Sequence, residues 1–227
     1  MAKSRIIKDL ANGTIDIEIA LKRAKVLLSE FDNADIKEWI NFEISGYPNT
    51  KNLPNYRVII GMIKGSYFRG SIISNIQYKN VSLPLGKMPD KDKRELQKMY
   101  FLEGIGSLKA LYEQSKSDSK NIHQPLPADL FPVFNKYNED PYMIITSAYV
   151  EIGFHYISNI ISIVENKLLD SLLLLEKEFG NLDELDIDTS NKSADEIKAI
   201  SEKIVYIIND NSINIGDNNS IKNSKIK

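Results

Sequence analysis

The chain has no cysteine, and this absence removes several kinds of site from consideration. Disulfide bonds, thiolate metal sites and cysteine nucleophiles are all excluded. A chain of 227 residues can bury an apolar core that is stable without such cross-links. The lack of cysteine also fits a reducing compartment, so we expect a cytoplasmic protein.

An excess of one charge and long apolar runs are also lacking. The 29 basic and 31 acidic side chains give a net charge of -2, so no strong positive field attracts nucleic acid, and we expect no nucleic-acid partner. The first residues enter an amphipathic pattern without the apolar core of a signal peptide. The most apolar run, residues 168–175, is too short to span a bilayer, so no membrane association is expected.

Common catalytic motifs are missing as well. The sequence contains no phosphate-binding Gly-x-x-x-x-Gly-Lys-Ser/Thr, no Gly-x-Gly-x-x-Gly before a helix and no Gly-x-Ser-x-Gly elbow. Only two histidines occur, and we expect His123 to be exposed in a polar loop at residues 115–128. We therefore assign no catalytic residue, and we expect no metal and no cofactor.

Two stretches keep open an alternative function, that of a metal-dependent nuclease toxin. Glu151 and His155 have the spacing of paired ligands on one helix face. Residues 89–98 hold three carboxylates among lysines, but this run is typical of the solvated start of a mixed-charge helix. The simpler interpretations are a packed histidine and a solvated helix face.

Apolar residues at helical spacing predict a helical hairpin near the N-terminus. A short helix over residues 6–10 precedes a second helix, in which apolar side chains repeat at intervals of four and three from Ile17 to Phe31. A third helix is expected at residues 34–45, with Asp32 or Asn33 as its cap and Gly46 after its end. The turn between the last two helices is short enough to pack them against each other.

The period changes to two from Tyr56 onward, which predicts strands. We expect an antiparallel sheet of about three strands over residues 55–86, followed by a helix over residues 90–101, a second helical piece and a short helical cap near residues 130–134. Residues 142–154 fit either a strand, which their alternation favours, or the start of the next helix.

A long helix, largely buried or shared with another subunit, is expected from residue 158 to a stop at Gly180. An acidic linker then leads to a capping box at Ser193 and Glu196, which begins an amphipathic helix ending near residue 208. The predicted fold class is therefore α+β and predominantly helical, with an N-terminal helical hairpin, a small antiparallel sheet, a long C-terminal buried helix and a short β-type tail rich in Asn, Ile and Ser.

That tail, residues 209–227, differs sharply from the rest in composition. The triplet Asn-Ser-Ile at residues 211–213 returns at residues 219–221, as in short β-solenoid rungs or strands that pair between chains. One copy cannot bury Ile213, Ile215, Ile221 and Ile226 on itself. The tail is therefore either disordered or ordered by self-association, and we expect a homo-oligomer.

The most distinctive stretch, residues 35–58, contains the only tryptophan. Five residues in it, Trp39, Glu43, Tyr47, Tyr56 and Arg57, have two interpretations. In the structural one, Trp39 packs the hairpin and Arg57 pairs with Glu38 or Glu43. In the functional one, helix end, turn and strand form a binding surface, because aromatic residues and arginine are frequent interface anchors.

This stretch resembles the AbiTii-type domain of bacterial abortive-infection proteins. The shared pattern is an amphipathic helix, then Trp39, Glu43 and Gly46-Tyr47, then Leu-Pro-Asn-Tyr-Arg-Val at residues 53–58. Softer similarity extends the domain over residues 1–180, which leaves residues 181–208 as a linker with an amphipathic helix and residues 209–227 as the tail. The family often has an arginine where this chain has Asn166-Lys167.

The resemblance implies defence against bacteriophage, with growth arrest or death of the infected cell as the outcome. It supplies no catalytic residue. We therefore expect a binding and oligomerising module, whose partner is a co-encoded defence effector or a phage component, rather than an enzyme.

Overall fold

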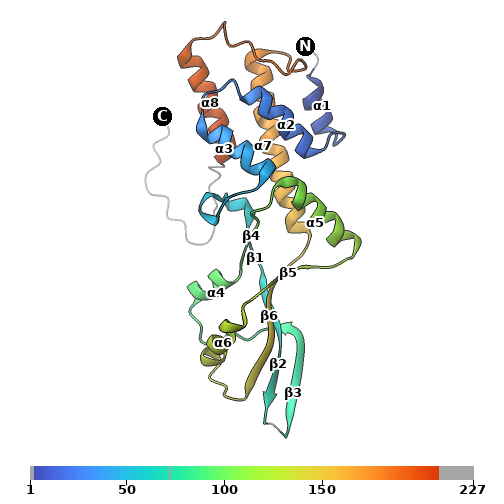
Figure 1. Ribbon diagram of the computed structural model, residues 1–227, viewed down its shortest axis with the longest axis vertical. Coiled ribbons are helices and arrows are strands. Elements are labelled where there is room, and N and C mark those ends of the chain that lie inside the picture. The colour runs from blue at the N-terminus through green and yellow to red at the C-terminus, as the bar shows by residue number, and fades with distance from the viewer. Residues whose placement is uncertain (1–2, 72, 210–227) are drawn as a thin grey trace.

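The computed structural model describes residues 3–71 and 73–209 and has most of its helices at one end and a sheet at the other (Figure 1). The expected association segment with Ile213, Ile215, Ile221 and Ile226 lies outside these described residues. The helices are α1 (Arg5–Ala11), α2 (Ile17–Leu28), α3 (Ala34–Ser45), α4 (Asp90–Leu96), α5 (Ile105–Ser117), α6 (Phe131–Asn138), α7 (His155–Phe179) and α8 (Ala194–Asn209), with short 3-10 turns η1 (Thr50–Asn52), η2 (Asn55–Arg57) and η3 (Ala128–Leu130).

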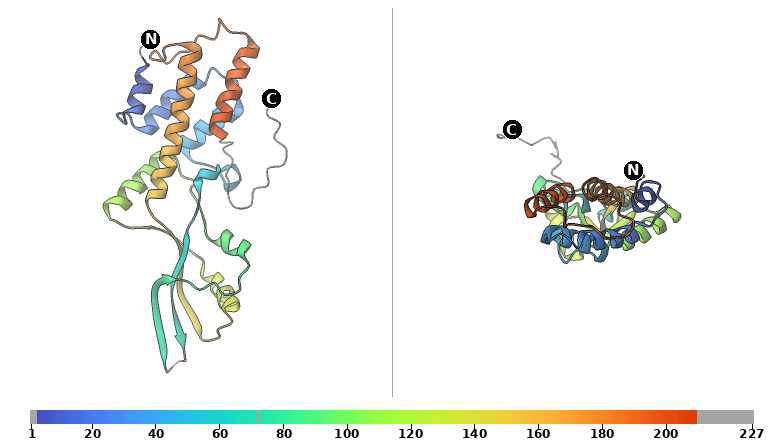
Figure 2. Two further views of the ribbon diagram at one scale, coloured as in Figure 1. Left: turned by 180° about the vertical axis from the view of Figure 1, so that it is seen from behind. Right: turned by 90° about the horizontal axis from the view of Figure 1, so that it is seen from above.

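The helical end has two layers (Figure 2). Helices α1, α7 and α8 lie in one layer, and α2, α3 and α5 lie in the other. The predicted hairpin of α2 and α3 is confirmed, because the two helices pack together and the side chain of Asn33 caps α3 by accepting from Ile36 N. Apolar side chains from both layers form one core, which includes the fully buried Leu21, Ile36 and Leu168.

The sheet contains strands from distant parts of the chain. Its order is β3 (Asn75–Ser82), β2 (Met62–Gly70), β6 (Met143–Ile152) and β5 (Ile122–Pro125), all antiparallel, while β1 (Val58–Ile60) pairs separately with β4 (Lys98–Tyr100). The antiparallel sheet is confirmed, but the prediction that it lies within residues 55–86 is wrong. Alternation reveals that a segment is extended, whereas the partner strand depends on the tertiary fold.

Three local predictions need correction or resolution. The helix expected over residues 90–101 ends at Leu96, and β4 follows it. The polar stretch at 115–128 is not a continuous loop, because α5 reaches Ser117 and His123 lies on β5. Residues 142–154 are resolved in favour of the strand, since β6 occupies the centre of the sheet.

Helix α7 joins the two ends of the molecule. Its first turns place Ile157 and Ile160 in the core beneath the sheet, and its later turns place Val164, Leu168 and Leu172 in the helical core. The predicted long buried helix is therefore confirmed. In the described part of the chain, no helix combines the length and the apolarity needed to cross a membrane.

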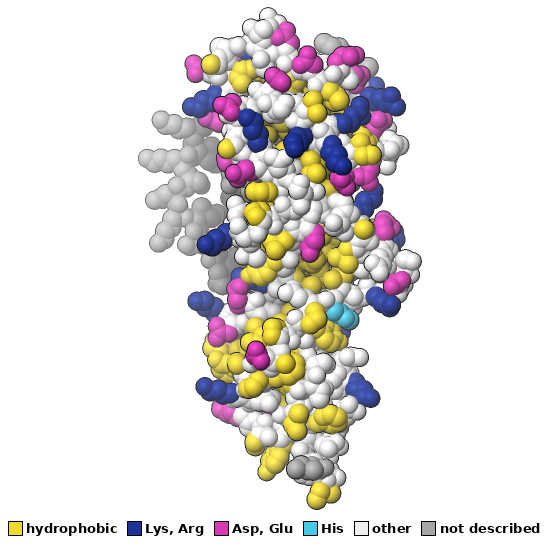
Figure 3. All heavy atoms as spheres, in the orientation of Figure 1, with side chains coloured by type: hydrophobic (Ala, Val, Ile, Leu, Met, Phe, Trp, Pro, Cys, Tyr) yellow, Lys and Arg dark blue, Asp and Glu magenta, His cyan; other side chains and the backbone are white. Residues whose placement is uncertain are grey.

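Helix α8 adds to the helical core and ends beside the centre of the molecule. Its capping box forms as expected, because the Ser193 hydroxyl accepts from Glu196 N while the Glu196 carboxylate accepts from Ser193 N. Ile200, Ile204 and Ile208 are buried in the same core as α2 and α7. Basic and acidic side chains alternate over the visible surface around the helices (Figure 3).

Candidate functional site

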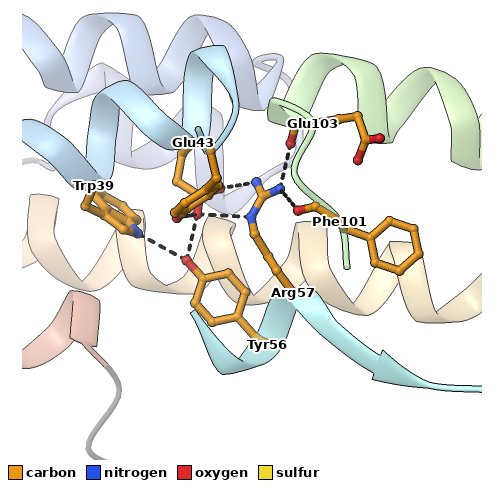
Figure 4. Close-up of polar contacts among 7 residues, drawn as sticks. Trp39, Glu43, Tyr56, Arg57, Phe101 and Glu103 are labelled. Atoms are coloured by element: carbon orange, nitrogen blue, oxygen red, sulfur yellow. Dashed lines mark hydrogen bonds and ion pairs between the residues drawn. The ribbon is translucent and has the colours of Figure 1, made fainter. Parts of the chain in front are cut away.

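The structure brings the five singled-out residues together at the junction of the helical end and the strands. Trp39 and Glu43 lie one turn apart on α3, Tyr47 follows the end of that helix, and Tyr56 and Arg57 lie on η2. Figure 4 shows the side chains of Trp39, Glu43, Tyr56 and Arg57 converging, with Arg57 reaching the main chain at Phe101 and Glu103.

The carboxylate of Glu43 is the centre of this cluster. Its Oε1 accepts from the hydroxyls of Tyr47 at 2.6 Å and Tyr56 at 2.7 Å, and from Arg57 Nε at 3.3 Å. Its Oε2 accepts from Arg57 Nη2 at 2.5 Å. Glu43 and Arg57 are both fully buried, so the structure pairs Arg57 with Glu43 and not with Glu38.

Arg57 also connects α3 to the segment between β4 and α5. Its Nη1 donates to the carbonyl oxygens of Phe101 at 3.1 Å and Glu103 at 2.6 Å. Each of the three guanidinium nitrogens of Arg57 thus donates to at least one acceptor. Such hydrogen bonds are what a buried ion pair needs to offset the loss of water.

Two glycines allow the backbone contact that this arrangement needs. Gly46 has a φ of 97°, and a Cβ there would lie 2.8 Å from the carbonyl oxygen of Leu102. A Cβ on Gly104 would lie 2.3 Å from the carbonyl oxygen of Ile44. Tyr47 N donates across the same junction to Leu102 O at 2.7 Å. Close packing here therefore explains why glycine follows α3 and precedes α5.

The electrostatics of the cluster fix its protonation. Burial and the adjacent Glu43 carboxylate raise the pKa of Tyr47 and of Tyr56 far above the ordinary range. Burial alone would lower the pKa of Arg57, but the charge and hydrogen bonds of Glu43 raise it. The tyrosines therefore remain donors and Arg57 remains a cation at neutral pH. These hydrogen bonds join α3 to η2, and neither the tyrosines nor the arginine exchange a proton near pH 7.

A groove opens on the other side of Trp39 and Tyr56. The indole Nε1 of Trp39 donates to the Tyr56 hydroxyl at 3.2 Å, which ties the groove wall to the buried cluster. The cavity has a volume of about 380 Å³, within the range of ligand pockets. It is bounded by α3, the η1–η2 loop and the end of α8, through Asp35, Glu38, Trp39, Phe42, Tyr47, Asn52, Leu53, Pro54, Asn55, Tyr56, Ile208 and Asn209.

The sequence did not reveal that α7 and α8 contribute to this site. Lys167 of α7 is largely buried, its Nζ lies 5.6 Å from the ring centroid of Tyr56, and it donates to the carbonyl oxygen of Ile207 at 2.9 Å. These contacts hold the end of α8 against the groove. The available signal was Lys167 itself, which interrupts the apolar spacing between Val164 and Leu168.

The other candidate positions do not converge. Asp90 and Glu95 on α4 form ion pairs with Lys93 at 3.4 Å and Lys98 at 2.6 Å, as on a solvated helix face. Glu151 does not share a helix face with His155, because Glu151 lies on β6 and His155 begins α7. Among the described residues, no three His, Asp or Glu side chains are grouped as a metal site would require.

Glu151 has different partners from those considered in the sequence. It accepts from Lys64 Nζ at 2.5 Å and lies 2.8 Å from Nε2 of His123, whose ring packs on Tyr149. The hydrogen bond from Lys64 lowers the pKa of Glu151, burial opposes this, and His123 adds to the lowering. His123 is exposed, as expected, but it belongs to a cross-strand cluster rather than to a loop.

Comparisons with known proteins identify one family. The sequence model of one family, AbiTii, matches residues 4–200 and so spans the cluster, the sheet and the first part of α8. No curated protein and no solved structure gives a match. The matched region covers most of the 227 residues. The chain therefore belongs to the AbiTii family of abortive-infection proteins, which act in defence against phage.

Proposed function

We propose that this abortive-infection protein acts as a binding and oligomerising module, with the groove beside Trp39 as its partner site. The observation that supports this most is the placement of the groove on the buried Glu43–Arg57 cluster. A rigid wall lowers the entropy cost of binding, because few side chains must be ordered when the partner arrives.

The chemistry of the groove favours a basic partner segment. Its only charged lining residues are Asp35 and Glu38, both exposed and both without an ion pair in the described part of the chain. Trp39, Phe42 and Tyr56 supply aromatic surface below them. Carboxylates above aromatic rings suit lysine or arginine side chains with apolar neighbours, on a co-encoded effector or a phage component.

The alternative, a metal-dependent nuclease toxin, has less support. Its proposed carboxylates lie along the exposed helix α4 or are engaged by Lys64 and His123 on the sheet. A nuclease would need several of them to face one metal ion.

The test compares phage protection by two triple variants in cells that express the full chain. Asp35→Ala, Glu38→Ala and Asn55→Ala remove exposed groove side chains, and we expect protection to be lost. If each truncation costs about 1 kcal/mol of binding, partner affinity falls by roughly a hundredfold or more. Plaque counts and survival of the infected culture measure the effect.

Asp90→Ala, Asp92→Ala and Glu95→Ala on α4 form the matched control, since they also remove exposed polar side chains. We expect this variant to protect as well as the unmodified protein. Loss of protection in the α4 variant alone, with divalent-metal-dependent cleavage of nucleic acid by the purified protein, would replace our proposal with the nuclease.

A further inference from the structure

The described chain ends at the groove. Asn209, the last described residue, and its neighbour Ile208 both line the groove. Residues 210–227 therefore start from its edge. An extended chain covers about 3.3 Å per residue. Residues 210–219 are therefore long enough to turn back and let residues 220–227 reach the groove.

The two halves of the tail have opposite charge. Residues 210–219 contain Asp210 and Asp217 and no basic residue. Residues 220–227 contain Lys222, Lys225 and Lys227 and no acidic residue. The groove side chains Asp35 and Glu38 thus attract the second half and repel the first.

The apolar residues of the second half also match the groove. Ile221 and Ile226 lie directly beside lysines in the sequence. The groove offers Trp39, Phe42 and Leu53 as apolar surface next to its carboxylates. Isoleucine side chains and lysine stems can cover that surface while the ammonium groups approach the carboxylates.

A tail of the same chain has an advantage over any free peptide. A short flexible connection gives the attached segment an effective concentration in the millimolar range. Closing a loop of about ten residues costs little more than closing a shorter one. Weak, exposed ion pairs are therefore enough to keep an attached segment bound.

We propose that residues 220–227 of the same chain occupy the groove when no partner is bound. This inference rests on the proposed function of the groove and adds its regulation: a basic partner segment must displace the tail. Docking also withdraws Ile221 and Ile226 from contacts between copies. Displacement by a partner therefore links recognition to assembly.

The absence of cysteine makes a direct distance measurement possible. Asn52→Cys on the groove edge and Ser224→Cys in the tail of the full chain receive spin labels, and double electron–electron resonance reports the distance distribution. Labelled protein is diluted with excess unlabelled protein, so that only distances within one chain are detected. We expect a narrow, short-distance population under dilution.

Charge reversal tests the cause of that population. Lys222→Glu, Lys225→Glu and Lys227→Glu should lower the ratio of docked to undocked tail by about tenfold, which corresponds to about 1.4 kcal/mol. Adding Asp35→Lys and Glu38→Lys to this variant should restore the short distance. Lys8→Glu, Lys79→Glu and Lys91→Glu change the net charge equally at exposed sites elsewhere and should leave it intact.

Several outcomes would overturn self-docking. A broad distance distribution in the unmodified protein would do so, as would a short distance that charge reversal leaves unchanged. A short distance that disappears on dilution would assign the groove to the tail of a second copy. These results are independent of phage protection, so failure of self-docking and failure of the proposed partner site can be told apart.

Discussion

At the scale of single residues, the cluster around Glu43 depends on complete pairing of buried charge. Glu43 and Arg57 are fully buried, and the two tyrosine hydroxyls and two main-chain carbonyls complete their hydrogen bonds. The ion pair itself need not contribute much net stability, because removing both charges from water is costly. Removing one partner, in contrast, leaves the other charge buried without compensation.

Glu43→Gln is therefore expected to lower the free energy of unfolding by about 3–5 kcal/mol. Urea denaturation followed by the fluorescence of Trp39, the only tryptophan, measures this change. The double variant Glu43→Leu with Arg57→Met should lose less than the sum of the two single variants, because no charge is stranded.

Asp35→Asn on the same helix is the control for this series. Asp35 is exposed, and its replacement should change stability by no more than about 0.5 kcal/mol. A Glu43→Gln variant as stable as this control would mean that the cluster does not hold α3 to the strands.

At the scale of elements, one carboxylate of α7 helps to hold the start of α1 against that helix. Glu176 accepts from Ser4 N and Ser4 Oγ, both at 2.6 Å, and pairs with Lys3 at 2.6 Å. Burial alone would raise the pKa of Glu176, but Lys3 and Ser4 lower it to about 2 from an ordinary value of 4.5. The lowered pKa means that the folded state prefers the ionised carboxylate.

The stabilisation by Glu176 is fully present above pH 4.5 and is lost as the pH falls toward 2, because in this window the unfolded chain binds a proton that the folded protein does not. Glu176→Gln should lower the free energy of unfolding at pH 7 by about 1–2 kcal/mol. It should also make the free energy of unfolding depend less on pH between 4.5 and 2. Urea midpoints measured across pH test the prediction, with the exposed Glu202→Gln of α8 as the matched control. Parallel curves for Glu176→Gln and the unmodified protein would contradict it.

Elements with strong local signals could be predicted from the sequence, whereas contacts between distant segments could not. The bounds of α3 follow from the Asn33 cap and from Gly46. The pairing of β2 with β6 leaves no local signal, because alternation is the same whichever strand lies alongside. Likewise the residues around Trp39 are distinctive in sequence, but the groove needs Ile208, which only the packing of α8 brings there.

At the scale of the whole molecule, two cores joined by α7 carry the groove that we propose as the partner site, and the isoleucine-rich tail is the proposed means of assembly. Residues 213, 215, 221 and 226 are isoleucines surrounded by polar residues, and they can be buried only against another surface. Transfer of apolar side chains from water between copies would then favour the oligomer.

Replacing Ile213, Ile215, Ile221 and Ile226 by aspartate in the full chain should therefore reduce the mass measured by light scattering toward that of one 25.8 kDa chain. The matched control places the same four charges at Asn211, Ser212, Ser220 and Ser224 and keeps every isoleucine. We expect this control to remain assembled, and to assemble more readily than the unmodified protein, because added negative charge weakens tail docking against Asp35 and Glu38. A single-chain mass for the unmodified protein and for both variants would show that the tail does not assemble the protein, and would leave the groove as its only proposed contact.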